Sequence, residues 1–448
     1  MRIHLIAIGG AAMHNLALAL AAQGHQVSGS DDEIFEPSRG RLARAGLLPE
    51  QMGWDANRIQ PDIDAIILGM HARKDNPELQ KASALGLSIY SYPAFMASQA
   101  EHKTRVVIGG SHGKTTITSM VLHALKQFKI ATDYLVGSQL PGFDFMAEIL
   151  PEAQFALYEG DEYLASALEP IPKFHVYQGH IGCISGIAWD HVNVFPTFEN
   201  YVAQFAGFID SLMPHGTLIY NEEDTITRQL VEEHPRKDIT FIPYGTPAYL
   251  LEKEQFIVRW KEKSYPVSVK GKHNLQNMAA AAQIACRMGV SFENFFSSMA
   301  SFSGAAKRME IQHEDAQNAW SVIRDFGHSP SKVAATMQAV AESWPDRQLS
   351  ILFELHTFSS LSEHFLPMYA EAFKAFPQAR IYFSPEAVAH KRLPELSVSK
   401  VSDAIGLPKS QIFTTTEQVV SFLKEQPRKQ AVWLLMSSGN FGGWTPDW

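Results

Sequence analysis

The strongest structural signal in this chain is the stretch Arg105-Val106-Val107-Ile108-Gly109-Gly110-Ser111-His112-Gly113-Lys114-Thr115-Thr116. Its first four residues predict a short buried strand, and residues 117–128, with apolar side chains at helical spacing, predict a helix. Three glycines lie in the turn between them. A strand, a tight glycine turn and a helix in this order are typical of α/β proteins with parallel sheets.

The same turn predicts binding of a nucleoside triphosphate. Backbone N–H groups of such a turn surround phosphate oxygens, Lys114 reaches the outer phosphates, and the Thr115 hydroxyl binds Mg²⁺. The usual loop is one residue longer, because Ile108 stands where its first glycine belongs, so we expect Gly109 to take that role. The predicted ATP-binding residues of the turn are Gly110, Ser111, His112, Gly113, Lys114, Thr115 and Thr116.

Two segments downstream carry groups that suit a metal ion beside this turn. Residues 155–159 predict a strand ending at Glu159, and a carboxylate at the carboxyl end of a strand beside a phosphate loop is a natural Mg²⁺ ligand. Residues 184–188 predict another strand, which leads to Asp190-His191. An Asp-His pair alone is more often an ordinary loop, but its place after the next strand of the same sheet favours a functional role.

The N-terminus predicts a second phosphate-binding turn. Residues 3–8 form an apolar run that ends in Gly9-Gly10, and an apolar helix pattern follows. Another strand, at residues 26–30, ends in Asp31. This is half of a Rossmann-like unit, in which a helix N-terminus faces an anionic ligand and an acidic side chain binds a sugar hydroxyl. The glycine spacing is incomplete, so a tight turn without a ligand is the alternative.

The C-terminal third predicts another Rossmann-like sheet. Strand patterns alternate with helix patterns there, which is the rhythm of a parallel sheet. The expected strands are Ser321–Asp325, Leu349–Glu354, Arg380–Phe383 and Val432–Met436. We therefore predict three α/β domains: a Rossmann-like domain at residues 1–102, a P-loop ATPase-like domain at 103–304 and a second Rossmann-like domain at 305–448.

Composition excludes several classes of protein. At 448 residues with 46% apolar side chains, the chain is too apolar to be largely disordered. Its net charge of −9 is opposite to that of a general binder of nucleic acids or anionic membranes. Two cysteines provide no disulfide framework, and no stretch of about 18 apolar residues predicts a membrane span. We expect a cytoplasmic protein without nucleic acid or inserted membrane segments.

One more pair of side chains is a candidate for nucleotide binding. Asn274 and Asn277 are three residues apart, hence on one face of a predicted helix, where two amides can bind an adenine edge or a ribose. Helix capping by Asn274 is the alternative.

Taken together, these motifs resemble the Mur ligase family, the ATP-dependent amide-forming enzymes of peptidoglycan synthesis. The turn resembles the family's G-T-H-G-K-T-T signature. The remaining motifs occur in the family's order, from residue 3 to about residue 443. They are Gly9-Gly10, Asn76-Pro77-Glu78, Glu159-Gly160-Asp161-Glu162-Tyr163, Asp190-His191, His273-Asn274 with Asn277, Phe302 and Gly304 leading to Lys307-Arg308, and Asp325-Phe326-Gly327-His328-Ser329-Pro330.

The resemblance implies a reaction and roles for residues. The lactyl carboxylate of UDP-N-acetylmuramic acid attacks ATP to form an acyl phosphate, and an amine then displaces phosphate. It implies ATP and Mg²⁺ as cofactors, small-molecule substrates, and a monomer or weak homo-oligomer. The implied catalytic residues are Lys114, His191, Arg308, Asp325 and His328; the metal ligands are Thr115, Glu159 and His191; Asn274 and Asn277 hold the nucleoside; and Gly9, Gly10 and Asp31 hold the UDP-sugar.

Two branches of the family accept UDP-N-acetylmuramic acid itself, one adding L-alanine and one adding a recovered tripeptide, L-Ala-γ-D-Glu-meso-diaminopimelate. The motif at residues 159–163 resembles the tripeptide branch's E-G-D-E-Y more than the alanine branch's E-A-D-E-S. Phe326 stands where the alanine branch usually has Tyr, and residues 436–443 resemble the tripeptide branch's M-S-N-G-x-F-G-G. We therefore favour the tripeptide branch, which serves peptidoglycan recycling, with the L-alanine branch as the alternative.

Two departures from the family pattern bear on this choice. The family usually has two acidic residues and two histidines around residues 324–329, where this chain has Arg324 and Ser329. The alanine branch holds its substrate's carboxylate with arginines after the strand at 351–353, but residues 354–360 contain none. A nucleotide-binding regulator without catalysis is therefore a further alternative, and a folylpolyglutamate synthase and a dehydrogenase are weaker ones.

Overall fold

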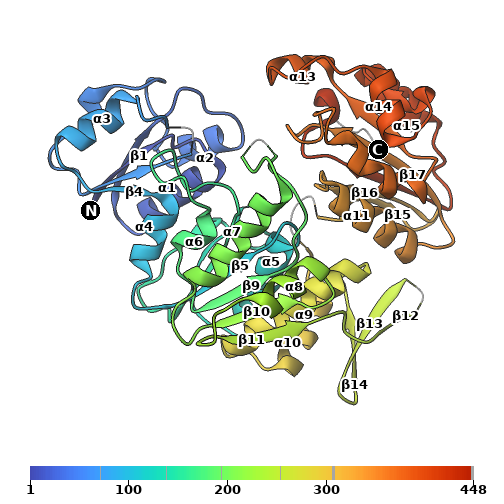
Figure 1. Cartoon of the computed structure of the whole chain (residues 1–448), viewed down its shortest axis with the longest axis horizontal. Helices are drawn as coiled ribbons and strands as arrows, with labels where there is room; N and C mark the ends of the chain where they lie inside the picture. Colours follow the sequence, from blue (N-terminus) through green and yellow to red (C-terminus); the bar gives the residue numbers. More distant parts are fainter. Residues whose placement is uncertain (71, 138, 193, 253, 305–307, 445–448) are drawn as a thin grey trace. The chain divides into compact units, whose positions relative to one another are not determined.

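The computed structural model describes residues 1–448 except 71, 138, 193, 253, 305–307 and 445–448 (Figure 1). It is an α/β protein, as predicted, and its larger sheets are mostly parallel. The chain divides into two compact units, each assembled from three segments. The first unit contains residues 1–187, 202–245 and 277–298, and the second contains residues 188–201, 246–276 and 299–448.

The first sheet has four parallel strands in the order β2-β1-β3-β4. The strand predicted at residues 26–30 and most of the apolar run at residues 3–8 lie in this sheet, and helices connect its strands. The strands are β1 (Arg2–Ile6), β2 (Gln26–Ser30), β3 (Ala65–Leu68) and β4 (Ile89–Ser91). The connecting helices are α1 (Ala11–Ala22), α2 (Ser38–Arg44), η1 (Ala56–Arg58), α3 (Pro77–Ala84) and α4 (Tyr92–Gln99).

The second sheet has seven strands in the order β11-β10-β9-β5-β8-β6-β7, and only the edge strand β7 is antiparallel to its neighbour. Strand β5, which carries the glycine turn, lies near the centre. The strands are β5 (Thr104–Gly109), β6 (Thr132–Leu135), β7 (Ala147–Glu148), β8 (Phe155–Glu159), β9 (Ile181–Ile184), β10 (Thr217–Asn221) and β11 (Thr240–Tyr244). The helices are α5 (Lys114–Gln127), α6 (Lys173–Val176), α7 (Phe198–Ser211), α8 (Thr225–Glu233), α9 (Lys272–Arg287) and α10 (Phe292–Ser298), with the short η2 (Met299–Ser301).

A small antiparallel sheet follows, formed by β12 (Tyr249–Glu252), β13 (Gln255–Trp260) and β14 (Lys263–Val267). It belongs to the second unit. There, Arg347 donates two hydrogen bonds to the Glu254 carboxylate at 3.0 and 3.1 Å, and Tyr249 Oη donates to Glu342 at 2.8 Å. The small sheet is thus tied to the C-terminal segment of its unit.

The last sheet has six strands in the order β15-β16-β20-β17-β18-β19, all parallel except β15. The strands are β15 (Glu310–Asp315), β16 (Trp320–Asp325), β17 (Gln348–Leu355), β18 (Arg380–Phe383), β19 (Ile412–Phe413) and β20 (Ala431–Met436). The helices are α11 (Pro330–Ser343), η3 (Leu366–Tyr369), α12 (Ala370–Lys374), α13 (Pro385–His390), α14 (Val398–Ile405), η4 (Lys409–Gln411), α15 (Thr416–Glu425) and η5 (Phe441–Gly443).

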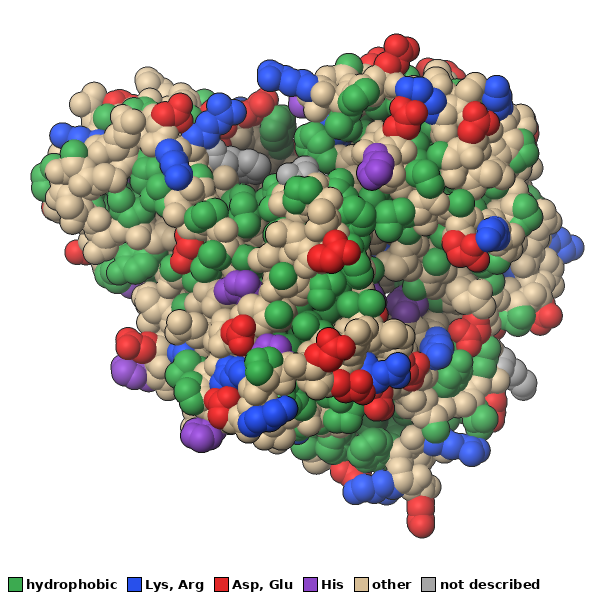
Figure 2. Space-filling view, viewed as in Figure 1, with side chains coloured by type: hydrophobic (Ala, Val, Ile, Leu, Met, Phe, Trp, Pro, Cys, Tyr) green, Lys and Arg blue, Asp and Glu red, His purple; other side chains and the backbone are tan. Residues whose placement is uncertain are grey.

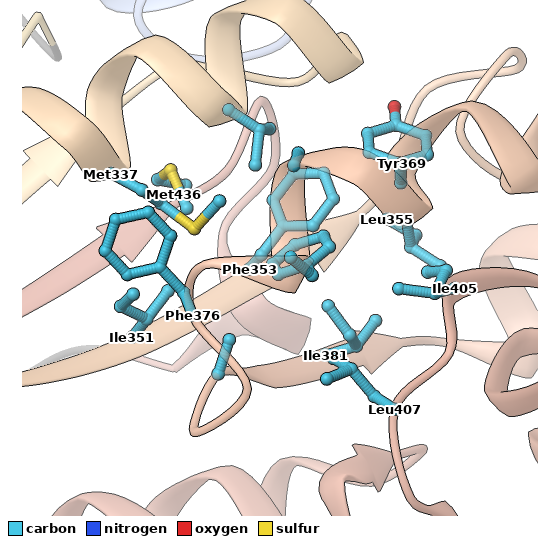
Figure 3. Packing of buried hydrophobic residues seen from close by; sticks show 14 of the residues in the cluster. Met337, Ile351, Phe353, Leu355, Tyr369, Phe376, Ile381, Ile405, Leu407 and Met436 are labelled. Carbon is cyan, nitrogen blue, oxygen red and sulfur yellow. The ribbon is translucent and has the colours of Figure 1, made fainter.

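One face of this sheet carries a large apolar core (Figure 3). Side chains of the central strands, such as Ile351 and Phe353, pack against Met337 of α11 and Tyr369 of η3, and each is fully buried. Burial of apolar surface is the main favourable contribution to folding. This core therefore holds the carboxyl ends of β16, β20 and β17 in place.

The sheets fall within the sequence ranges expected for three domains. The four-stranded, seven-stranded and six-stranded sheets occupy residues 2–91, 104–244 and 310–436. The two compact units group these ranges differently, because residues 246–276 belong with the C-terminal segment. The three-domain boundaries therefore stay a prediction.

Two expectations about element bounds were wrong. Helix α5 begins at Lys114 rather than residue 117, because Gly113, with φ of +81°, turns the chain directly into the helix. The strand predicted at residues 184–188 is instead β9, Ile181–Ile184. After it, Gly186 has φ of +148° and its carbonyl accepts a hydrogen bond from Ser111 N–H at 2.9 Å, so this segment supports the glycine turn instead of continuing the sheet.

In the part of the chain that the structure describes, no helix is both long and apolar enough to cross a bilayer. On the face shown in Figure 2, acidic and basic side chains are interspersed.

Candidate active site

The glycine turn between β5 and α5 is held closed by the segment after β9. A Cβ on Gly110 would lie 2.0 Å from Ser185 Oγ, so only glycine fits there. Ser185 Oγ donates to the backbone carbonyl of His112 and, at 3.3 Å, to that of Gly109. These contacts hold the turn in a conformation that presents the N-terminus of a 14-residue helix, a favourable place for phosphate oxygens.

Lys114, the first residue of α5, projects into a group of carboxylates. Its Nζ donates to the Gly110 carbonyl and to Glu162 Oε2, both at 2.6 Å, and lies 3.8 Å from Asp161 Oδ1. Burial alone would lower the pKa of Lys114, but the carboxylates of Glu162 and Asp161 outweigh it and raise the pKa. The side chain is therefore a permanent cation at the helix N-terminus.

A hydroxyl and a carboxylate meet beside this lysine. Thr115 Oγ1 donates to Glu159 Oε1 at 2.6 Å, and the second oxygen of Glu159 accepts from Gly137 N–H at 2.9 Å. Both residues of the predicted metal site in this unit are thus adjacent. A hydroxyl and a carboxylate are hard oxygen donors, which fit Mg²⁺.

The two asparagines of α9 have different surroundings. Asn277 lies against the turn, because a Cβ on Gly113 would be 2.3 Å from its Oδ1. Asn274, in the second unit, donates from Nδ2 to the Lys270 carbonyl at 2.9 Å. The alternative role for Asn274, helix capping, is wrong, since α9 begins two residues earlier, at Lys272.

The N-terminal turn borders a cavity of about 840 Å³. Gly9 and Gly10 line it together with Asp31, and Gly9 N–H donates to Asp31 Oδ2 at 2.7 Å. Burial raises the pKa of Asp31 to about 6, although the Gly9 hydrogen bond opposes this. All three predicted UDP-sugar residues therefore share one cavity, whose remaining lining residues include Trp54, Arg73 and Asn76.

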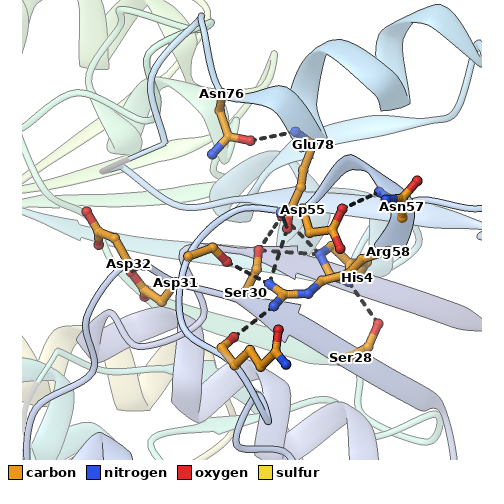
Figure 4. A network of polar contacts seen from close by, with 12 residues as sticks. His4, Ser28, Ser30, Asp31, Asp32, Asp55, Asn57, Arg58, Asn76 and Glu78 are labelled. Carbon is orange, nitrogen blue, oxygen red and sulfur yellow. Dashed lines mark hydrogen bonds and ion pairs between the residues drawn. The ribbon is translucent and has the colours of Figure 1, made fainter.

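A buried polar network supports the wall of this cavity (Figure 4). Glu78, fully buried in α3, accepts from Ser30 Oγ at the end of β2 and from Asp55 N–H at 2.9 Å. His4 Nε2 of β1 lies 3.4 Å from the same carboxylate. Asn76 caps α3 by accepting from Glu78 N–H at 2.9 Å. The Asn-Pro-Glu motif thus joins the middle of β1 and the carboxyl end of β2 to the helix that borders the cavity.

In the second unit, Asp190 and His328 form a buried pair. His328 Nε2 lies 3.6 Å and Lys332 Nζ 3.7 Å from Asp190 Oδ2, and Asp190 Oδ1 accepts from His191 N–H at 2.8 Å. Burial would raise the pKa of Asp190, but these partners outweigh it and lower the pKa strongly. His191 has φ of +53°, an uncommon conformation for a residue with a side chain that often marks functional sites.

Asp325, at the end of β16, organises the segment before α11. It accepts hydrogen bonds from Gly327 N–H at 2.6 Å, Met309 N–H at 2.8 Å and Thr336 Oγ1 at 3.2 Å. The guanidinium of Arg308 lies 4.9 Å from the centroid of the Phe326 ring. Lys307 lies outside the described residues.

The segment after β20 is held by two oppositely charged side chains. The Glu354 carboxylate, 2% exposed, accepts from Ser437 Oγ and from Phe441 N–H at 2.8 Å. Arg324 Nη2 donates to the Gly439 carbonyl at 3.0 Å, and its guanidinium stacks over Phe441. Arg324, which departs from the family pattern, is thus a support for this segment.

Sequence reasoning did not identify several of these residues. Glu162 was within a quoted motif, but its contact with Lys114 depends on the turn after β8. Lys173 and Lys332 lie outside all motifs, and only the fold brings them to Asp161 and Asp190.

Comparison with known proteins bears on the family of this chain. Residues 2–104 match the model described as "Mur ligase family, catalytic domain", and residues 108–285 match "Mur ligase middle domain". A UDP-N-acetylmuramate–L-alanine ligase of Arthrobacter sp. (strain FB24) is 30% identical over 393 residues, covering 85% of this chain and 80% of the relative.

Among the solved structures that resemble nearly the whole chain are two ligases that accept UDP-N-acetylmuramate or murein peptide substrates according to their names. The murein peptide ligase from Psychrobacter arcticus 273-4 has a TM-score of 0.68 at 21% identity and covers 99% of this chain and 97% of its own. The UDP-N-acetylmuramate–alanine ligase from Thermotoga maritima has a TM-score of 0.70 at 19% identity, with 98% and 96% covered. At these identities the likeness concerns the fold. Together with the sequence relative and the family models, it leads to one conclusion: the chain belongs to the Mur ligase family, the ATP-dependent amide-forming ligases of peptidoglycan synthesis.

Proposed function

We propose that this enzyme joins the lactyl carboxylate of UDP-N-acetylmuramic acid to the amine of a peptide, L-Ala-γ-D-Glu-meso-diaminopimelate, as a murein peptide ligase does. A carboxylate is a poor electrophile, so it must first be activated. One of its oxygens attacks the γ-phosphorus of ATP, and the bond to the β–γ bridging oxygen breaks with its electron pair leaving on ADP. The amine then attacks the acyl phosphate, phosphate leaves with the C–O electron pair, and the ammonium proton passes to a base.

Most of the groups that we assign to the first half of the reaction lie in the first unit. Lys114 neutralises charge on the outer phosphates, and the turn from Gly110 to Thr116 binds them through backbone N–H groups. Thr115 and Glu159 would hold Mg²⁺, and the ion would neutralise phosphate charge. Asn277, packed on Gly113, holds the nucleoside. The cavity bordered by Gly9, Gly10 and Asp31 takes the UDP-sugar.

The second unit supplies the remaining roles. His191 would be a ligand for a second Mg²⁺, Arg308 would bind phosphate oxygens, and Asn274 would contribute to the nucleoside site. Asp325 and His328 lie near the reacting groups. Asp325 acts through the hydrogen bonds that order the segment around residue 327, and His328 is paired with Asp190.

One observation carries the choice of amine. At the carboxyl end of β17, where the alanine branch has arginines for its substrate's carboxylate, this chain has the buried carboxylate Glu354, which anchors residues 437–441. A buried anion there disfavours the carboxylate of a single amino acid.

L-alanine is the second candidate for the amine. The Arthrobacter relative, which covers most of the chain, is an L-alanine ligase, and this favours it.

Phosphate release with ATP and UDP-N-acetylmuramic acid separates the candidates. We expect release to depend on the tripeptide, with kcat/KM at least about tenfold above that for L-alanine. A preference for L-alanine would overturn the choice of amine but keep the ligase chemistry. Release with neither amine would favour a regulator without catalysis.

A further inference from the structure

The P-loop lysine is not the only buried lysine at its cluster of carboxylates. Lys173, the first residue of α6, has a side chain that is 13% exposed and an Nζ that lies 2.8 Å from Asp161 Oδ2. Lys114 Nζ lies 3.8 Å from the other oxygen, Oδ1. One carboxylate is therefore flanked by two ammonium groups, one on each oxygen.

Lys173 lies beside Asp161 because the chain folds back on itself between these two residues. The excursion between residues 161 and 173 is closed by hydrogen bonds from Lys173 N–H to the Tyr163 carbonyl at 3.1 Å and from Phe174 N–H to the Asp161 carbonyl at 3.3 Å. The isolated bridge between Leu164 and Pro172 closes it further. Lys173 is thus held by backbone contacts and does not depend on its ion pair for its position.

The surroundings of Lys173 are aromatic on two sides. Its Nζ lies 5.8 Å from the ring centroid of Tyr92 and 5.9 Å from that of Tyr163, within the range of cation–π attraction. Tyr92 is the first residue of α4 and is 8% exposed. Burial alone would lower the pKa of Lys173, but Asp161 and Tyr92 outweigh it and raise the pKa. Lys173 is therefore charged at every working pH.

Asp161 is the more accessible member of the pair, since its side chain is 33% exposed. An incoming anion can therefore displace or join Asp161 at Lys173 without unfolding the buried wall behind the ammonium. In the proposed function, Lys114 binds the phosphates of ATP because it lies at the glycine turn. Lys173, whose Nζ lies 2.8 Å from Asp161 Oδ2, is then the second ammonium at this carboxylate, and the proposed role of Lys114 does not engage it.

From this juxtaposition we propose that Lys173 binds the carboxylate of the substrate that becomes phosphorylated, an inference that rests on the proposed function. Two anions, the carboxylate and the γ-phosphoryl group, must approach each other, and an ammonium beside each lowers their repulsion. The carboxylate oxygen attacks phosphorus, the bond to the bridging oxygen breaks toward ADP, and no proton moves. Lys173 then stays paired with the acyl phosphate until the amine attacks.

The test compares K173M with K103M. Lys103 is a matched control, because its side chain is 11% exposed and its Nζ lies 2.8 Å from Asp133 Oδ2, outside the proposed machinery. We measure KM for UDP-N-acetylmuramic acid and for ATP, kcat, the unfolding temperature, and hydroxamate formed when hydroxylamine traps the acyl phosphate without the amine substrate.

We expect K173M to lose about 10²-fold in kcat/KM for the UDP-sugar and to lose hydroxamate in proportion, while the Kd for a non-hydrolysable ATP analogue changes by less than about threefold. K173R should recover activity to within about tenfold. K103M should lower the unfolding temperature but leave KM for the UDP-sugar unchanged.

A wild-type KM for the UDP-sugar and a wild-type hydroxamate yield in K173M would overturn the inference, and so would an equal loss of affinity for the ATP analogue. If K173M does not fold, K173R is used for the test, and the ratio of KM for the UDP-sugar to KM for ATP is compared with that of the wild-type enzyme. A higher ratio in K173R supports the inference, and an unchanged ratio overturns it. If the wild-type enzyme forms no hydroxamate, the proposed function itself fails and the inference falls with it.

Discussion

The Glu354 carboxylate accepts a hydrogen bond from the backbone N–H of Phe441 at 2.8 Å, across 87 residues of sequence. The contact joins the end of β17 to the segment after β20. These strands are neighbours and parallel, so their carboxyl ends lie at the same edge of the sheet. In open α/β sheets this edge is where ligands bind. A single buried carboxylate therefore shapes the place where we expect the incoming amine.

Replacing Glu354 tests this relationship. E354A leaves Ser437 and Phe441 without their acceptor, so we expect the unfolding free energy to fall by about 2–4 kcal/mol and KM for the amine substrate to rise more than KM for ATP. Burial alone would raise the pKa of Glu354, but the hydrogen bonds that it accepts outweigh burial and lower the pKa from 4.5. Its stabilising contribution is thus present above about pH 4.5 and lost as the pH falls below that value. Chemical denaturation of E354A across this range should show a flatter pH profile; equal slopes would contradict the assignment.

Lys114 should be essential for the ATP step. K114A removes the cation from the N-terminus of α5, so we expect kcat/KM to fall by at least about 10²-fold, measured as ADP formation. K424A, which removes an exposed lysine of α15, is the control and should retain wild-type rates. Full activity of K114A would refute the proposed role of the glycine turn.

We expect that Gly113 tolerates no side chain. Gly24 is the control that separates backbone strain from a steric clash of the added Cβ. Both have similar backbone angles, with φ of +81° and +84°, but a Cβ on Gly113 would meet Asn277 at 2.3 Å, whereas a Cβ on Gly24 would meet nothing within 4 Å. G24A should cost about 1–2 kcal/mol from backbone strain alone. G113A should cost about 2–4 kcal/mol and abolish tight binding of an ATP analogue. In calorimetry, equal stability losses for the two variants would argue against close packing of the turn on Asn277.

The Asp31 carboxyl should make binding of the UDP-sugar depend on pH. Because burial raises its pKa to about 6, the group is neutral below that pH and becomes a stronger acceptor for a sugar hydroxyl above it. We expect KM for the UDP-sugar to fall as pH rises from 5 to 7, and D31N to abolish the dependence. The free energy of unfolding should change with pH in the opposite direction to substrate affinity. Because its pKa is raised in the folded state, Asp31 stabilises the protein at low pH, and this stabilisation is lost as the pH rises through about 6. A pH-independent KM in the wild-type enzyme would exclude Asp31 from the site.

Much of the fold follows from local patterns. Local patterns predicted several strands in each of the three large sheets, and β18 agrees with its expected bounds residue for residue. The strand after residue 184 was misplaced because its apolar pattern continues past β9, while the chain itself turns at Gly186 to contact the glycine turn. Local hydrophobicity carries no information about such a tertiary contact.

The sequence by itself determined the family, the glycine turn and the residue types for phosphate chemistry, because backbone conformation and charge at a strand-to-helix turn are local properties. Only the tertiary structure decided which other side chains join them. Lys173 contacts Asp161, and Asn277 packs on Gly113. Arg324 and Glu354 hold the segment after β20. These contacts form because separate strands end at the same edge of a sheet and because the chain folds back on itself. The paired residues are far apart in the sequence, so a local sequence motif cannot predict the pairs.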